Sequence, residues 1–103
     1  MMKILANAFS INMLNVDGIL NVQFEEITSA DIPVDAESQI GHKDMADLLT
    51  NLLSRDVKVN RANCKLTKSD ELYVAQYIGP RLSEGAVDLP EGATIKFFKV
   101  TVL

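Results

Sequence analysis

The chain has 103 residues, 48% hydrophobic and 23% charged, a balance typical of one folded domain rather than a disordered chain. Fourteen acidic and ten basic residues give a net charge of -4, which argues against a protein that coats DNA through a broad cationic surface. The single cysteine allows no intrachain disulfide, and no Cys/His cluster suits zinc. No stretch is long and apolar enough to span a membrane, so we expect a cytoplasmic protein with no membrane partner.

The first predicted strand is the short apolar run of residues 3–9, and a turn with room for one helical turn follows at residues 10–14. Asn7, Ser10 and Asn12 cluster at the end of this strand. Polar side chains at the carboxyl end of a strand often line a ligand crevice. They equally suit hydrogen bonds within a turn, and the sequence alone does not separate these two interpretations.

A second strand is predicted near residues 20–25, where apolar and polar residues alternate as in a strand with one wet face. Residues 29–38 contain a proline and several acids, so we expect a loop with room for a helical turn.

The only histidine, His42, stands where an amphipathic helix is predicted to begin. The apolar residues of this helix, expected over residues 43–54, recur with helical spacing at Met45, Leu48, Leu49, Leu52 and Leu53. A helix start exposes unpaired N–H groups that suit phosphate, and an imidazole can pass a proton near neutral pH. Spacing alone favours the simpler interpretation of a polar residue beside a helix cap.

Residues 58–66 have weak strand signals and carry Arg61, which alone suggests only a solvated side chain. The strongest strand prediction is residues 71–78, whose two populated faces indicate a central place in a sheet. Gln76 lies on an otherwise apolar face of this strand, so it either bonds a neighbour or reaches into a site.

A short helical turn is predicted after that strand, because Pro80 suits its first position and Gly85 its cap. This turn would put Arg81 and Glu84 on one face, either as a weak surface ion pair or as a clamp for a phosphate. A last strand is predicted over residues 94–102. Its apolar pattern shifts between residues 97 and 98, which indicates a bulge or burial on both faces.

The order of these elements predicts one α/β domain over residues 1–103, with a mixed sheet of about five strands and packed helices. No Gly-rich phosphate loop, no G-x-S-x-G elbow and no metal-ligand spacing is present, so we expect neither cofactor nor metal. One histidine, a few arginines and several amides suit phosphodiester cleavage by an internal hydroxyl, where positioning and one proton donor suffice.

Four blocks of the sequence resemble the viral anti-CRISPR ring nucleases, small proteins of archaeal viruses, phages and mobile elements. The most specific block is residues 5–14, LANAFSINML, which resembles the opening signature of that family. The resemblance continues, in the family's order, through Ile40-Gly41-His42, Asn60-Arg61 with Lys65-Leu66, and Arg81-Leu82 with Glu84-Gly85.

The resemblance implies a homodimer that binds and cleaves cyclic tetra-adenylate, the messenger of type III CRISPR defence, without a metal. It implies catalytic roles for His42 and Glu84, although steering Arg81 is an alternative task for Glu84. The residues implied to bind the ligand are Asn7, Ser10, Asn12, Arg61, Gln76 and Arg81. In the implied reaction a ribose 2′-hydroxyl attacks the adjacent phosphorus, and His42 protonates the departing 5′-oxygen.

The sequence departs from archaeal-virus members at Lys43 and Pro80, where those tend to carry an acid and a glutamine. Both changes could alter the grip on the ring, and Lys43 could add a phosphate contact. Two alternatives stay open: a protein that only sequesters the cyclic nucleotide, and a structural or regulatory dimer of a mobile element. Whether a virus or its host encodes the chain is also open.

Overall fold

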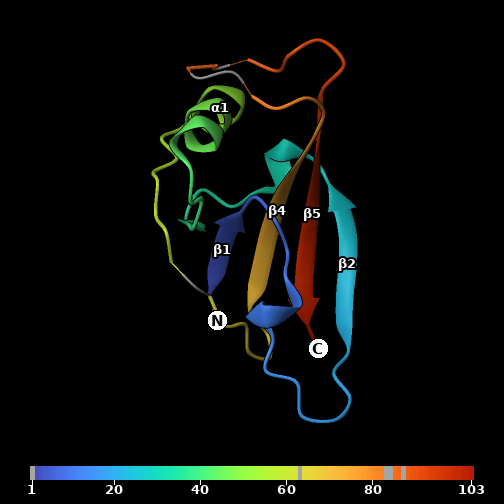
Figure 1. The fold of residues 1–103 in the computed structure, drawn as a ribbon. Coiled ribbons are helices and arrows are strands. Elements are labelled where there is room, and N and C mark those ends of the chain that lie inside the picture. The colour runs from blue at the N-terminus through green and yellow to red at the C-terminus, as the bar shows by residue number, and fades with distance from the viewer. Residues whose placement is uncertain (1, 63, 83–84, 87) are drawn as a thin grey trace.

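A mixed β-sheet organises the chain, as the computed structural model of residues 2–62, 64–82, 85–86 and 88–103 shows (Figure 1). Its strand order is β2-β5-β4-β1-β3. The strands are β1 (Lys3–Ala6), β2 (Val22–Ile27), β3 (Glu37–Ser38), β4 (Glu71–Ile78) and β5 (Thr94–Val102). The helix is α1 (Lys43–Leu53), and two short 3₁₀ turns are η1 (Ile11–Met13) and η2 (Ser29–Asp31). Strand β1 pairs in parallel with β3 and β4, whereas β5 pairs antiparallel with β4 and β2. The predicted α/β domain with a five-stranded mixed sheet is confirmed.

Two hydrophobic clusters lie on opposite faces of this sheet. On one face α1 packs against Leu5, Tyr73 and Ala75. On the other face Leu72 and Val74 pack with residues of the η1 region. Strand β4 contributes to both clusters because successive side chains of a strand point to opposite faces. Its predicted central position is therefore confirmed, and its bounds match the prediction.

Helix α1 forms where its apolar period predicted it, with His42 as N-cap. Its buried residues are Met45, Ala46, Leu48 and Leu49. The helix ends at Leu53 because Ser54 adopts the left-handed conformation, with φ 54°. The hydroxyl of Thr50 then accepts a hydrogen bond from the Val57 N–H at 2.9 Å, which folds the following segment back onto the helix.

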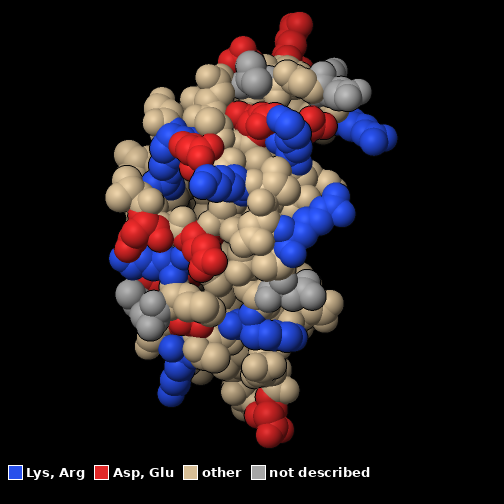
Figure 2. Space-filling model, turned by 90° about the vertical axis from the view of Figure 1, so that its left-hand side faces the viewer, with Lys and Arg blue, Asp and Glu red and all other residues tan. Residues whose placement is uncertain are grey.

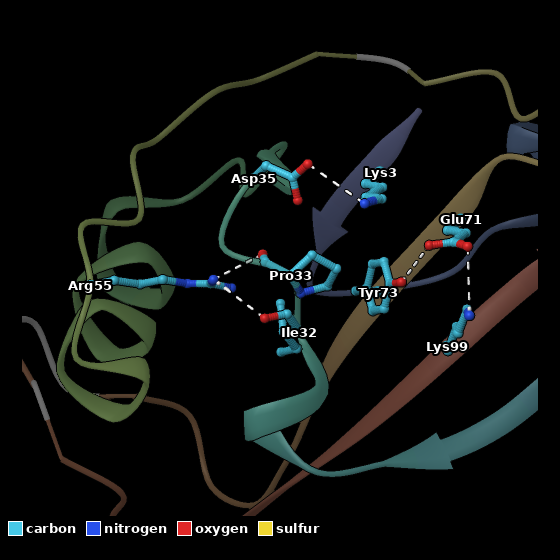
Figure 3. A network of polar contacts seen from close by, with 8 residues as sticks. All are labelled: Lys3, Ile32, Pro33, Asp35, Arg55, Glu71, Tyr73 and Lys99. Atoms are coloured by element: carbon cyan, nitrogen blue, oxygen red, sulfur yellow. Dashed lines mark hydrogen bonds and ion pairs between the residues drawn. The ribbon is translucent and has the colours of Figure 1, made fainter. Parts of the chain in front are cut away.

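Polar contacts join the segment after α1 to the loop before this helix, that loop to β1 through Lys3 and Asp35, and β4 to β5 (Figure 3). The Arg55 guanidinium donates to the carbonyl of Pro33 at 2.9 Å. The Tyr73 hydroxyl donates to the Glu71 carboxylate at 2.5 Å, and Glu71 also pairs with Lys99 at 3.6 Å. Burial and the hydrogen bond to that carboxylate raise the pKa of Tyr73 far above its usual value, so its hydroxyl stays protonated.

Strand β5 settles the two interpretations of its shifted apolar pattern. It pairs without interruption with all of β4, from Thr94 to Thr101, so the shift marks no bulge. Ile95 and Phe97 pack on the cluster that contains α1, whereas Phe98 and Val100 belong to the opposite cluster. The side chains of β5 that pack in a hydrophobic cluster thus lie on one face near the start of the strand and on the other face near its end.

Several predicted boundaries differ from the structure. Strand β1 ends at Ala6 rather than at residue 9, because Phe9 packs instead with the second cluster, edge-to-face with Phe24 at a centroid distance of 5.3 Å. Strand β2 begins at Val22, and β3 lies within the predicted loop. Residues 58–66 make only isolated bridges in their described part, Ile40 with Val59 and Leu14 with Leu66.

The predicted helical turn after β4 is not seen in the residues described there. Pro80 lies in a bend and Gly85 in a turn, while Glu84 lies outside the described residues. The close approach of this loop to the strand that follows requires a glycine: a Cβ on Gly79 would lie 2.6 Å from that of Ala93.

Candidate functional site

A pocket of about 450 Å³ lies beside the carboxyl ends of β1 and β3. It is lined by Asn7, Gln39, Gly41, His42, Arg61 and Ala62, which we call the histidine pocket. Asn7 directly follows β1 and Gln39 directly follows β3. Adjacent parallel strands end at the same edge of a sheet, which is where open α/β sheets tend to hold ligands. A crevice, one of the two interpretations left open for the end of the first strand, is therefore present.

His42 is held at this pocket by the backbone on either side of it. The Gln39 N–H donates to the Leu5 carbonyl at 2.8 Å, and the His42 carbonyl accepts from the Ala46 N–H at 3.0 Å. The His42 side chain is exposed and makes no capping hydrogen bond to α1. The imidazole and the first N–H groups of the helix thus both remain available to a ligand.

Arg61 is brought to the same place by contacts between segments twenty residues apart. The Asn60 N–H donates to the Ile40 carbonyl at 2.8 Å, and the Asn60 side-chain amide donates to the Ser38 carbonyl at 3.0 Å. Arg61 then donates its Nε–H to the Gly41 carbonyl at 2.8 Å. This bond fixes the guanidinium beside His42 and uses one of its five donors, so the terminal N–H groups can serve an anion.

A second pocket of about 390 Å³ adjoins the first and shares Ala62 with it. It is lined by Ser10, Asn12, Met13, Ala62, Cys64 and Lys65, which we call the lysine pocket. Ser10 caps η1, because its hydroxyl accepts from the Asn12 N–H at 3.3 Å. Burial raises the pKa of Cys64, so its thiol forms a neutral wall.

The charged side chains that line the two pockets are basic. Neither pocket is lined by an acidic side chain among the described residues, although the chain as a whole has a net charge of -4. Figure 2 shows one face of the molecule, on which acidic and basic side chains mix toward the left. An anion is the ligand that such a lining favours.

Lys43 does not join this basic lining. Its ammonium contacts the Asp47 carboxylate at 2.6 Å one turn along α1, and this contact raises the pKa of Lys43. The Lys43 ammonium, which the sequence suggested as a phosphate contact, is therefore paired with a carboxylate of its own helix.

The structure brings together five of the eight site residues inferred from the sequence. Asn7, His42 and Arg61 line the histidine pocket, and Ser10 and Asn12 line the lysine pocket.

The other three residues lie elsewhere or outside the described residues. Gln76 is exposed, donates to the Tyr77 carbonyl at 3.3 Å, and lines a separate apolar pocket with Phe9, Phe24, Val74, Phe98 and Val100. The bond to a neighbour, one of its two predicted roles, is present, and its role toward a ligand stays a prediction. Arg81 is exposed and lines neither basic pocket. Glu84 lies outside the described residues.

Sequence reasoning did not assign a role to Gln39, Ala62, Cys64 or Lys65, which also line the pockets. Gln39 stands three residues before His42, and Lys65 stands in one of the four blocks that resemble the ring nucleases, so both carried a positional signal. Cys64 and Ala62 carried none, because small apolar residues in a loop do not indicate which wall they form.

The described residues contain neither a metal-binding cluster nor a membrane-spanning helix. No cluster of three His, Cys, Asp or Glu side chains there could hold a metal ion. No helix there is long and apolar enough to cross a membrane.

Comparison with known proteins assigns the chain to one family. The sequence profile of the STIV B116-like family matches residues 3–98, and the chain belongs to that family. Among solved structures, the chain is similar to B116 of Sulfolobus turreted icosahedral virus, with 26% identity and a TM-score of 0.78. That match covers 97% of this chain and 98% of the viral protein. None of the curated proteins matches the chain.

Proposed function

We propose that the protein is a metal-independent ring nuclease that binds cyclic tetra-adenylate and cleaves it to linear products ending in 2′,3′-cyclic phosphates. The observation that carries this proposal is the histidine pocket, where one imidazole and one anchored guanidinium stand together without an acidic neighbour in the described lining. The resemblance of four sequence blocks to the ring nucleases supplies the identity of the ligand. Acting in the cytoplasm, such an enzyme would antagonise type III CRISPR defence.

In this mechanism, the bond from a ribose 2′-oxygen to phosphorus forms as the bond to the 5′-oxygen breaks, and the proton of the 2′-hydroxyl passes to solvent water. His42 gives its proton to the departing 5′-oxygen, which avoids the release of a high-energy alkoxide. Arg61 holds the phosphate under attack, since a guanidinium can contact two phosphate oxygens at once. The helix N-terminus adds a favourable dipole for the same anion.

The ligand would be shared by two copies of the chain. A ring of four identical nucleotides presents two equivalent halves, which suits two identical subunits about a two-fold axis. Arg81 and Gln76, which lie outside the two pockets, belong to this proposal as further ligand-binding residues, and Glu84 belongs to it as a further catalytic residue.

Incubating the purified protein with cyclic tetra-adenylate in EDTA tests the proposal. We expect the wild type to produce a 2′,3′-cyclic phosphate and His42→Ala to lower the cleavage rate by at least about a hundredfold, as expected for loss of a general acid. His42→Ala should still bind the ring, because Arg61 and the amides remain.

Two outcomes would replace the proposal with its alternatives. Tight binding by the wild type without cleavage would indicate a sequestering protein. Neither binding nor cleavage would leave a structural or regulatory dimer.

A further inference from the structure

The lysine pocket contains a cation that takes no part in the proposed bond cleavage. Lys65 lines this pocket, and its ammonium donates a hydrogen bond to the backbone carbonyl of Asn12. The neighbouring backbone holds both partners in place, since the Leu66 N–H donates to the Met13 carbonyl at 2.7 Å. Lys65 is exposed to solvent, and the bond to Asn12 holds its ammonium against η1.

The charge of Lys65 is not neutralised by any carboxylate of the described residues. Four other lysines of the described residues have such partners, for example Lys43 with Asp47 and Lys99 with Glu71, whereas Lys58 and Lys68 have none there. An ammonium has three N–H donors, and the bond to Asn12 uses one of them. Two donors and a full charge therefore remain in a pocket whose other polar side chains, among the described residues, include the Ser10 hydroxyl and the Asn12 amide.

We propose that Lys65 binds a phosphate of the ligand, so that the lysine pocket is a second anion subsite beside the histidine pocket. The identity of the ligand rests on the proposed function. The two pockets meet at Ala62, and each has one basic side chain held by a backbone carbonyl: Arg61 by Gly41 and Lys65 by Asn12. A nucleotide chain with regularly spaced phosphates fits two adjoining cationic subsites. Histidine and arginine act on one phosphate, and lysine holds the next.

A purely structural role for Lys65, pinning η1 through Asn12, is the competing explanation. Lys65→Gln removes the charge but keeps a donor, and Lys65→Arg keeps both. Lys68→Gln is a matched control, because this lysine is exposed, stands three residues away and lines neither pocket.

Affinity for cyclic tetra-adenylate, measured at several salt concentrations in a His42→Ala background, tests the proposal. We expect Lys65→Gln to weaken binding about tenfold, with Lys65→Arg restoring most of it and Lys68→Gln changing little. The slope of log affinity against log salt should become shallower by about 0.7 for each phosphate that the variant no longer neutralises. With His42 present, the effect of Lys65→Gln should appear in KM rather than in kcat.

A second probe separates failure of this inference from failure of the proposed function. Adenosine 5′-monophosphate, titrated into ¹⁵N-labelled protein, should shift the backbone amide signals of Ser10 and Asn12, and Lys65→Gln should suppress these shifts. Such shifts without binding of the cyclic ring would support the subsite and refute the ring nuclease. Cleavage of the ring with Lys65→Gln equal to wild type in affinity and salt slope would overturn the subsite and leave the nuclease standing. No shift with either nucleotide would overturn both.

Discussion

Arg61 illustrates how a single side chain acquires its place from contacts distant in sequence. The sequence alone indicated a solvated loop residue, and only the resemblance gave it a role. In the structure the bridge between Ile40 and Val59 brings residue 61 beside residue 41, where the Gly41 carbonyl holds the guanidinium. No period or spacing within residues 58–66 predicts that pairing, because the partners of this segment precede α1 in the sequence. His42, in contrast, could be placed from the sequence, since a helix start depends on adjacent residues.

Asp70 is a second residue whose role depends on the fold. Its side chain is 3% exposed and accepts hydrogen bonds from the Met2 N–H at 2.8 Å and the Thr67 N–H at 2.8 Å. The Thr67 hydroxyl also donates to it, at 2.9 Å. The backbone N–H groups of Met2 and Thr67 are the main reason that the pKa of Asp70 lies below its ordinary value. The charged carboxylate thus ties the first strand to the start of β4.

We expect Asp70→Asn to lower the free energy of unfolding at pH 7 by about 1–3 kcal/mol, because an amide replaces a charged acceptor of three hydrogen bonds. The lowered folded pKa means that the contribution of Asp70 is complete above about pH 4 and is lost as the pH falls through the folded value. The difference between wild type and variant in urea unfolding should therefore shrink below about pH 4.

Asp17→Asn serves as the control, since Asp17 is an exposed loop residue. A difference for Asp70→Asn that stays constant between pH 7 and pH 3 would contradict the role assigned to its charge.

Among the helices and strands, the sequence predicted those whose apolar residues recur at a regular spacing. It missed those that exist only because a neighbouring strand pairs with them. The bounds of β4 and β5 agree with the prediction because their alternating apolar residues face two real cores. Strand β3 has two residues, too few for any alternation, and exists because β1 offers it a parallel partner. The early end of β1 depends on Phe9 crossing to the other face, which no local pattern records.

The end of α1 offers a test of local backbone strain. Ser54 has φ 54°, a conformation that costs a residue with a Cβ about 1–2 kcal/mol and costs glycine little. Part of the gain from Ser54→Gly is offset by the greater freedom of glycine in the unfolded chain. We expect the variant to be more stable than wild type by about 0.5 kcal/mol, seen as a higher midpoint in urea.

Ser54→Ala retains the strained conformation and should bring no gain. Equal stabilisation by alanine and glycine would show that the left-handed conformation does not limit this helix end.

For the whole molecule, composition predicted one domain and the resemblance predicted a pair of copies. The first expectation agrees with the fold, in which both clusters share the same sheet. The second depends on surface complementarity, which a single sequence does not record. If two copies share one ring, light scattering coupled to gel filtration should give a mass of twice 11.3 kDa at micromolar concentration.

The same measurement with cyclic tetra-adenylate added should leave that mass unchanged if the dimer forms without the ligand. A monomer under both conditions would remove the two-fold arrangement from the proposed mechanism.

The hydrogen bonds that hold residues 58–66 to the rest of the fold have a consequence for the motion of the wall that the two pockets share. The Asn60 N–H is bonded to the Ile40 carbonyl near one end and the Leu66 N–H to the Met13 carbonyl at the other. Between these two points lie Arg61 and Lys65, the basic side chains of the two pockets. In hydrogen exchange, we expect the paired amides of Asn60 and Leu66 to exchange more slowly than those of Arg61 and Lys65. We therefore expect this shared wall of the two pockets to adjust to the ligand while the sheet keeps its hydrogen bonds.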